Sequence, residues 1–223
     1  MTNLVKSSII IYMNEKIKFK VLTFIRYLGD SFFYPFLALY LHSLSFGEAK
    51  IGYLIAIIPF ISILCNPIYS RLCKNTKILK NTLSIISFIE AIVIIGIIFA
   101  SNYYFILALI ILLSISGTSH YGLLDSLSTK FAKANNVNFS NIRMYGSISY
   151  IIGLIFGGYI IDYIGFNFSF FICSGLFILS SILYLLIKPI YDNVNNVEEK
   201  RNYKEVFNNK SFILFLIFYL LCF

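Results

Sequence analysis

Six long apolar runs dominate this sequence. An α-helix needs about 17–25 apolar residues to cross the ~30 Å hydrocarbon layer of a bilayer. Six runs have this length and are separated by short polar segments: 21–43, 51–69, 83–100, 103–124, 148–164 and 166–187. The sequence therefore predicts an all-α polytopic membrane protein.

The composition excludes other classes of protein. Hydrophobic residues make up 59% of the chain and charged residues 13%, about half the usual charged share of roughly 25%. A soluble enzyme could not build a polar surface from so few charges, and a disordered chain would not be so apolar. The net charge of +8 would fit nucleic-acid binding, but the basic residues cluster between the apolar runs. We therefore expect no nucleic-acid partner.

Lysine and arginine also predict the orientation in the membrane. The N-terminal segment and the loops after the second, fourth and sixth runs are basic, whereas the intervening loops carry one basic residue, Lys50. Cytoplasmic loops are enriched in Lys and Arg. We expect a multi-pass protein of the cell (plasma) membrane with a cytoplasmic N-terminus.

The polar segments predict four regions. Residues 1–20 form a cytoplasmic N-terminal segment, 21–188 a six-helix bundle, 189–211 a cytoplasmic linker, and 212–223 the start of a seventh helix. Twelve residues make about 18 Å of helix, too short to cross a bilayer. Two interpretations stay open: a truncated or decayed fragment without activity of its own, or a half that pairs with a separate six-helix half or a second copy. The start, Met1 or Met13, also stays open.

Charged residues inside membrane helices are costly and are therefore candidates for function. Arg26 and Asp30 lie four residues apart on one helix face, either as an ion pair that neutralises itself or as a pair that binds substrate or carries a proton. Glu90 lies mid-helix without a local cation, so we expect it to be protonated unless another helix supplies a base. It either makes a structural hydrogen bond or acts on a proton or the substrate. His120 is either hydrogen-bonded between helices or active in proton transfer.

Two further features lie on the fourth and fifth runs. Asp125 follows His120 near the cytoplasmic end of the fourth run, and continued apolar spacing predicts that this helix extends past it. Ser149, Gly153 and Gly157 repeat every four residues. Small residues at this spacing let another helix approach closely, so we interpret them as a helix-packing stripe.

No motif for a cofactor, metal or catalytic site is present in the sequence. The four cysteines are far apart and form no CxxC pair, which argues against a disulfide framework or a metal site. The HExxH, GxSxG and GxxxxGK[ST] motifs are also missing from it. We therefore expect neither an enzyme nor an ATP-driven pump, and no cofactor.

The sequence around the fourth and fifth runs resembles a known transporter family. The stretches at 123–126 and 142–148 read LLDS and IRMYGSI. With six helices, a charged linker and a seventh helix, they are similar to the N-terminal half of a major facilitator superfamily transporter. The resemblance is to the branch of lactose permease, nucleoside–proton symporters and phenylpropionate permease-like proteins. It implies two inverted three-helix repeats and a substrate site between two halves.

The resemblance also implies a function and site residues. The acidic residue and the arginine that lie at the binding cavity in that branch match Asp125 and Arg143. The implied function is proton-coupled transport of a sugar, nucleoside or aromatic acid by alternating access. We assign substrate binding to Asp125, Arg143, Arg26 and Asp30, and proton coupling to Glu90, Asp30 and His120. The implied partners are a small-molecule substrate, protons, the lipid bilayer, and the missing C-terminal six-helix half or a second copy.

One loop departs from the pattern of that superfamily. The loop between its second and third helices usually carries a Gly and an Asp followed by basic residues. The corresponding stretch 70–77 reads SRLCKNTK here, which is basic but has no acid. The gating contact of that acid is therefore not expected in this chain.

Overall fold

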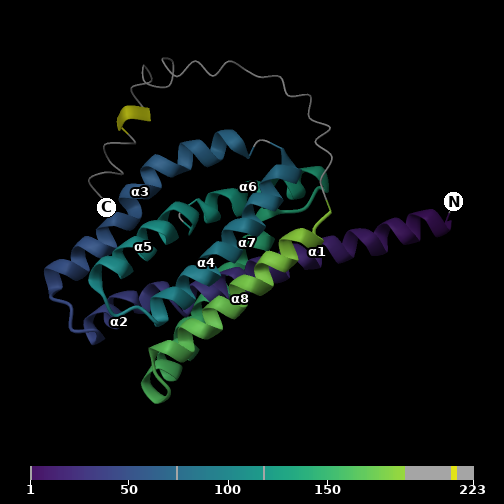
Figure 1. The fold of residues 1–223 in the computed structure, drawn as a ribbon. Helices are drawn as coiled ribbons and strands as arrows, with labels where there is room; N and C mark the ends of the chain where they lie inside the picture. The colour runs from purple at the N-terminus through teal and green to yellow at the C-terminus, as the bar shows by residue number, and fades with distance from the viewer. Residues whose placement is uncertain (1, 74, 118, 189–211, 215–223) are drawn as a thin grey trace. The chain divides into compact units, whose positions relative to one another are not determined.

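The computed structural model of the chain describes residues 2–73, 75–117, 119–188 and 212–214. The chain divides into two units, Met1–Tyr191 and Asp192–Phe223. The described part of the first is helical, as Figure 1 shows, and contains no strand. Its elements are α1 (Thr2–Ser31), the 3₁₀ turn η1 (Tyr34–Phe36), α2 (Leu37–Ser43), α3 (Glu48–Leu72), α4 (Thr76–Ile98), α5 (Tyr103–Gly117), α6 (His120–Ala134), α7 (Phe139–Tyr163) and α8 (Phe166–Leu186).

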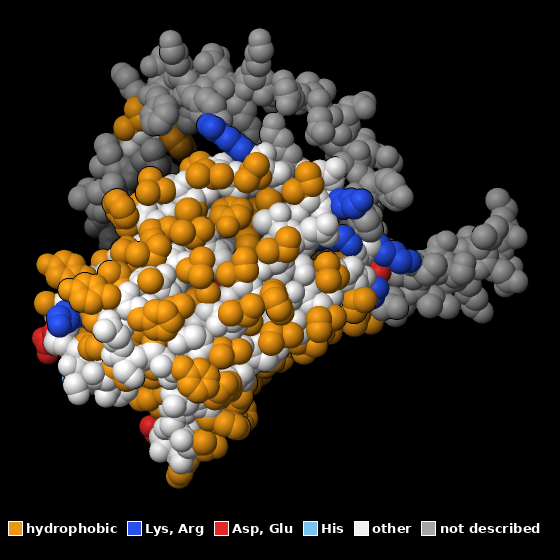
Figure 2. Space-filling model, in the orientation of Figure 1, with side chains coloured by type: hydrophobic (Ala, Val, Ile, Leu, Met, Phe, Trp, Pro, Cys, Tyr) orange, Lys and Arg blue, Asp and Glu red, His pale blue; other side chains and the backbone are white. Residues whose placement is uncertain are grey.

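The all-α polytopic prediction is confirmed. Among the described residues, five helical segments are long and apolar enough to span a membrane: α3, α4, the stretch Tyr103–Ala134, α7 and α8. The first apolar run is not among them, and its helix α1 carries the buried charges Arg26 and Asp30. Figure 2 shows apolar side chains across one face, with acidic and basic side chains at its margins. Such a surface fits a lipid environment better than water.

Two expected helices are interrupted. The run expected as one helix over 21–43 leaves the α conformation after Ser31 and passes through η1 before α2 begins. Pro35 lies in η1; proline has no N–H and disfavours the α conformation in the residue before it. The run expected over 103–124 breaks between Gly117 and His120, and α6 then continues to Ala134. Asp125 therefore lies within a helix, as the extended apolar spacing predicted.

The helices pack in a regular set of pairs. Helix α1 packs on α7 and α8, α4 packs on α8 and α5, and α3 packs on α5. These pairs show an internal symmetry. If α1 is exchanged with α5–α6, α3 with α7 and α4 with α8, each packed pair becomes a pair of the same set. A two-fold relation between two three-helix repeats would give such pairs, and the inverted-repeat arrangement stays a prediction.

Lysine side chains hold the end of α8. Lys80 Nζ donates to the carbonyl oxygens of Ile187 at 2.8 Å and Leu185 at 3.3 Å. Lys18 Nζ lies 3.4 Å from the Leu186 carbonyl oxygen. The last carbonyls of a helix have no partner within the helix, and basic side chains satisfy them. These contacts fix α8 to α1 and α4 at the end where the linker 189–211 begins. The linker lies outside the described residues, as does most of the expected seventh helix, of which Phe212–Leu214 are helical.

Candidate functional site

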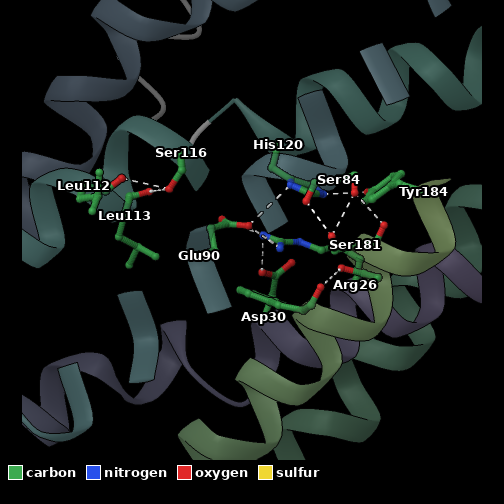
Figure 3. Close-up of polar contacts among 12 residues, drawn as sticks. Arg26, Asp30, Ser84, Glu90, Leu112, Leu113, Ser116, His120, Ser181 and Tyr184 are labelled. Carbon is green, nitrogen blue, oxygen red and sulfur yellow. Dashed lines mark hydrogen bonds and ion pairs between the residues drawn. The ribbon is translucent and has the colours of Figure 1, made fainter. Parts of the chain in front are cut away.

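A buried ion cluster occupies the centre of the bundle, where α1 faces α4. Arg26 Nη1 donates to Glu90 Oε2 at 2.6 Å, and Nη2 donates to Oε1 at 3.0 Å. Arg26 Nη2 also lies 3.1 Å from Asp30 Oδ1. All three side chains are 0% exposed. Figure 3 shows Arg26 between the two carboxylates. Two parallel N–H···O bonds are the strongest geometry for an Arg–carboxylate pair.

Helix α8 closes the cluster on another side. The guanidinium carbon of Arg26 lies 3.8 Å from the centroid of the Phe177 ring. A cation over an aromatic face is attracted by the ring quadrupole, and more strongly where water is excluded. Phe177 thus holds the arginine in place without adding a negative charge.

His120 joins the cluster to a tyrosine on α8. Its Nδ1 lies 3.7 Å from Glu90 Oε2, and its Nε2 shares a hydrogen bond of 2.8 Å with the Tyr184 hydroxyl. Both side chains are fully buried. In Figure 3 the imidazole ring lies between Glu90 and Tyr184. The histidine is therefore both hydrogen-bonded between helices and adjacent to a carboxylate.

The cluster is charged but incompletely hydrogen-bonded. It contains one guanidinium and two carboxylates. Arg26 Nε and His120 Nδ1 have no hydrogen-bond partner among the described residues, whereas Asp30 pairs with Arg26 and is approached by the Tyr121 hydroxyl. Buried polar atoms in proteins are nearly always hydrogen-bonded, so these exceptions in one site call for a functional explanation. The site therefore has buried polar atoms that other described protein groups do not satisfy.

The structure brings together four residues that sequence patterns suggested separately. Arg26 and Asp30 pair on one helix face, as their spacing indicates. Glu90 has no cation on its own helix, but α1 supplies Arg26, which is the case of a base from another helix that the sequence left open. His120 lies beside both. None of the four lines an open cavity in the described structure, because each is 0% exposed.

Asp125 and Arg143 form a second, more accessible pair. Arg143 Nε lies 3.6 Å from Asp125 Oδ1, and the two side chains are 38% and 39% exposed. The guanidinium also lies 4.5 Å from the centroid of the Tyr27 ring on α1. This pair joins α6 and α7 and leaves both charged groups partly exposed.

Two tyrosines lie between the two charged sites. Tyr27 follows Arg26 in the sequence and stacks under Arg143. Its ring centroid is 5.3 Å from that of Tyr121, which follows His120. A chain of aromatic contacts thus connects the accessible pair with the buried cluster.

The small-residue stripe of α7 packs against α1. Ser149, Gly153 and Gly157 are buried. A Cβ atom at Gly153 would clash with the Ser31 hydroxyl, and one at Gly157 would lie 2.9 Å from the Phe36 ring. The missing side chains permit this close approach and thereby set the distance between Arg143 on α7 and Tyr27 on α1.

Sequence patterns missed the tyrosines of the site. Tyr27 and Tyr121 directly follow charged or titratable residues inside apolar runs, which is a signal that could have marked them. Tyr184 carries no such mark, because its contact with His120 depends on which helices meet. Among the described residues, no group of three or more His, Cys, Asp or Glu side chains could hold a metal ion.

Comparison with known proteins gives the family. Residues 16–223 match the MFS_1 like family, which is nearly the whole chain. The chain therefore belongs to the MFS_1 like family, and it corresponds to the N-terminal half of a transporter of the major facilitator type.

A curated relative and a solved structure agree with this assignment. The chain is 22% identical over 194 residues to "Uncharacterized transporter YwbF" of Bacillus subtilis (strain 168), covering 86% of this chain and 48% of that protein. Its fold is similar to the crystal structure of the nucleoside transporter NupG, with a TM-score of 0.74 and 18% identity over 94% of this chain and 54% of that one. The chain thus spans about half the length of the proteins that it resembles.

Proposed function

We propose that this chain forms one half of a proton-coupled secondary transporter that moves a small polar organic solute by alternating access. The observation that supports the proposal most is the buried cluster of Arg26, Asp30 and Glu90, with His120 beside it. Structural ion pairs can be replaced by apolar residues at little cost in stability. A cluster with an excess carboxylate and unsatisfied atoms suggests a functional role instead.

The charge balance of the cluster suits a proton site. With both carboxylates ionised and His120 neutral, the cluster carries a net charge of −1. An uncompensated charge in a water-excluded site is strongly unfavourable. One proton neutralises the cluster, and His120 and the carboxylates offer places to hold it. Proton binding and release would then change the forces between α1, α4 and α6, and this is how we propose that the gradient drives the transport cycle.

We propose that the solute binds at Asp125 and Arg143. The guanidinium has a planar fork that can hold a carboxylate and solute hydroxyls together, and Tyr27 offers an aromatic face beside it. These groups suit a sugar, a nucleoside or an aromatic acid. Arg26 and Asp30, which we also assigned to the solute, are fully buried, so we propose that they meet it only in another state of the cycle.

The solute site needs a second wall. The chain spans about half the length of its relatives, and the charged pair lies on one bundle. We propose that a C-terminal six-helix half, or a second copy of this chain, completes the site. The tyrosines between the pair and the cluster suggest how solute binding is coupled to the proton.

The test of this function is solute-dependent proton uptake. The complete transporter would be reconstituted in sealed vesicles and offered nucleosides, sugars and aromatic acids in turn. We expect one class to produce proton uptake that a protonophore abolishes. Accumulation that the protonophore leaves unchanged would contradict proton coupling. The 223-residue chain alone is the control and is expected to give no uptake; uptake by it would indicate that a second copy completes the site.

The proposed orientation predicts which loops a reagent can reach. The basic segments at the N-terminus, at 74–80, at 130–133 and at 192–210 are expected on the cytoplasmic side because positive loops are retained there. A cysteine placed at Lys77 should resist an impermeant thiol reagent in intact cells and react after the cells are opened. A cysteine at Lys50, in the opposite loop, is the matched control and should react in intact cells. Labelling of position 77 in intact cells would reverse the orientation.

The accessible pair gives a prediction for solute affinity. We expect Asp125→Asn and Arg143→Gln each to weaken solute binding at least about tenfold, which corresponds to ~1.4 kcal/mol. The protein should stay folded because a half-exposed ion pair contributes about 1 kcal/mol or less to stability. Binding would be measured by titration calorimetry on the complete transporter, with Lys133→Gln on α6 as the control. If affinity is unchanged in both variants, the pair is a structural link between α6 and α7.

A further inference from the structure

A cavity of about 290 Å³ lies between α3 and α5. Its lining includes four hydroxyl groups, from Tyr34, Ser62, Ser114 and Tyr121, beside the apolar Pro59 and Leu113. A bound water needs about 30 Å³ and two to four polar partners. The cavity therefore has room for several water molecules and has the hydroxyl groups to hold them.

Gly117 forms the wall between this cavity and the ion cluster. It lines the cavity. A Cβ atom at this position would clash with Glu90 Oε1 and would lie 2.9 Å from the Tyr34 hydroxyl. Glu90 itself is 0% exposed. The carboxylate thus lies directly behind the glycine backbone, with no side chain between it and the cavity.

The other directions around Glu90 are closed by protein groups. The titratable and charged groups that face it are Arg26 and Asp30 from α1, Tyr34 from η1, Tyr69 from α3, His120 from α6, and Cys173 and Tyr184 from α8. Of these, Arg26 holds both carboxylate oxygens, and His120 is engaged with Tyr184. Tyr34 lines the cavity and is partly exposed. The Gly117 backbone therefore separates this cavity from Glu90.

We propose that this cavity is a water-filled antechamber through which protons reach Glu90, and that Gly117 is its aperture. The proposal rests on the proton-coupling function proposed above and adds the route to it. A water chain held by the hydroxyls of Tyr34, Ser62 and Ser114 delivers the proton, and the carboxylate oxygen Oε1 receives it past the glycine.

The test measures how fast a proton on Glu90 exchanges with solvent. The 223-residue chain in membranes would be transferred to D₂O, and the C=O stretching band of its protonated carboxyl followed by time-resolved infrared spectroscopy. Loss of the band in Glu90→Gln assigns it. We expect rapid exchange in the unmodified chain. In Gly117→Ala exchange should be at least about tenfold slower, because it must then wait for a local opening of the bundle.

A second variant shows whether slower exchange comes from closing the cavity or from a direct disturbance of Glu90. Ser62→Phe fills the cavity from α3 without contact with the cluster, and it should slow exchange in the same way. Gly122→Ala is the control for the glycine, since a Cβ atom there meets nothing within 4 Å. Ile63→Phe is the control on α3, at a residue that is 72% exposed. Both controls should exchange as the unmodified chain does.

The outcomes distinguish a failure of the proposed proton route through the cavity from a failure of the proposed proton coupling. Unchanged exchange in Gly117→Ala and Ser62→Phe would overturn the antechamber while leaving proton coupling intact. Absence of a Glu90 carboxyl band at every pH would overturn the antechamber as a route to Glu90 and would move the proton to Asp30 or His120. Slow exchange confined to Gly117→Ala would also overturn the antechamber and would indicate a direct effect on the ion cluster.

Discussion

Arg26→Met is expected to destabilise the bundle by about 3–5 kcal/mol, the usual consequence of removing one partner of a buried ion pair. Methionine fills a similar volume but leaves the carboxylates of Asp30 and Glu90 without their shared cation. Both side chains are 0% exposed, so water cannot replace the guanidinium. The loss would be measured as the shift in thermal or denaturant unfolding, followed by circular dichroism in detergent.

Two further variants test whether the loss of stability comes from leaving the buried carboxylates unpaired. Arg143→Met removes the other arginine, whose side chain is 38% exposed, and should cost no more than about 1 kcal/mol. The triple variant Arg26→Met, Asp30→Asn, Glu90→Gln removes the charges together and should recover most of the stability, because a neutral cluster leaves no buried charge. Equal stability of Arg26→Met and the unmodified chain would mean that neither carboxylate is ionised in the bundle.

The helices of this protein could be predicted from the sequence because length and apolarity alone decide whether a segment can span a membrane. The C-terminal ends of α4, α7 and α8 lie one or two residues before the ends of the apolar runs that suggested them, whereas α4 and α7 begin seven and nine residues before theirs. The breaks after Ser31 and Gly117 were harder to predict. Proline and glycine also occur inside continuous membrane helices, as Pro59 and Pro67 do in α3. Whether such a residue breaks a helix depends on its neighbours in the fold.

The site was predictable where its residues are close in sequence. Arg26 and Asp30 are one helical turn apart, and this spacing predicts a shared face. The pairing of Arg26 with Glu90, 64 positions away, required the packing of α1 on its neighbours, which no local pattern contains. Gly117 shows the same limit. Its importance comes from the atoms that a side chain would displace, and those belong to η1 and α4.

Glu90→Gln is expected to abolish accumulation of solute against its gradient in the complete transporter while leaving solute exchange in place. The amide keeps the size of the side chain and can still accept a hydrogen bond from Arg26. It cannot gain or lose a proton. Arg26 and Asp30 then form a neutral pair, so the cluster stays permanently in the charge state that a bound proton would give.

Solute exchange and solute accumulation differ in whether they require release of the proton. A transporter fixed in the proton-loaded state can still exchange solute inside for solute outside, because exchange requires no proton release. Accumulation does require it and should fall to the equilibrium level. Uptake of radiolabelled solute into vesicles with and without a proton gradient would measure accumulation, and vesicles preloaded with solute would measure exchange. Glu48→Gln, in the first turn of α3 and exposed, is the control.

Asp30→Asn tests whether Glu90 is the particular carboxylate that carries the proton. Both variants remove one negative charge from the cluster, but Glu90 alone accepts two hydrogen bonds from Arg26 and lies beside His120. Loss of accumulation in both would mean that the proton is shared across the cluster. Loss in Glu90→Gln alone would assign it to the carboxylate behind Gly117. If both variants accumulate solute as the unmodified transporter does, the coupling proton binds outside this cluster, and the excess carboxylate in the core must have another explanation.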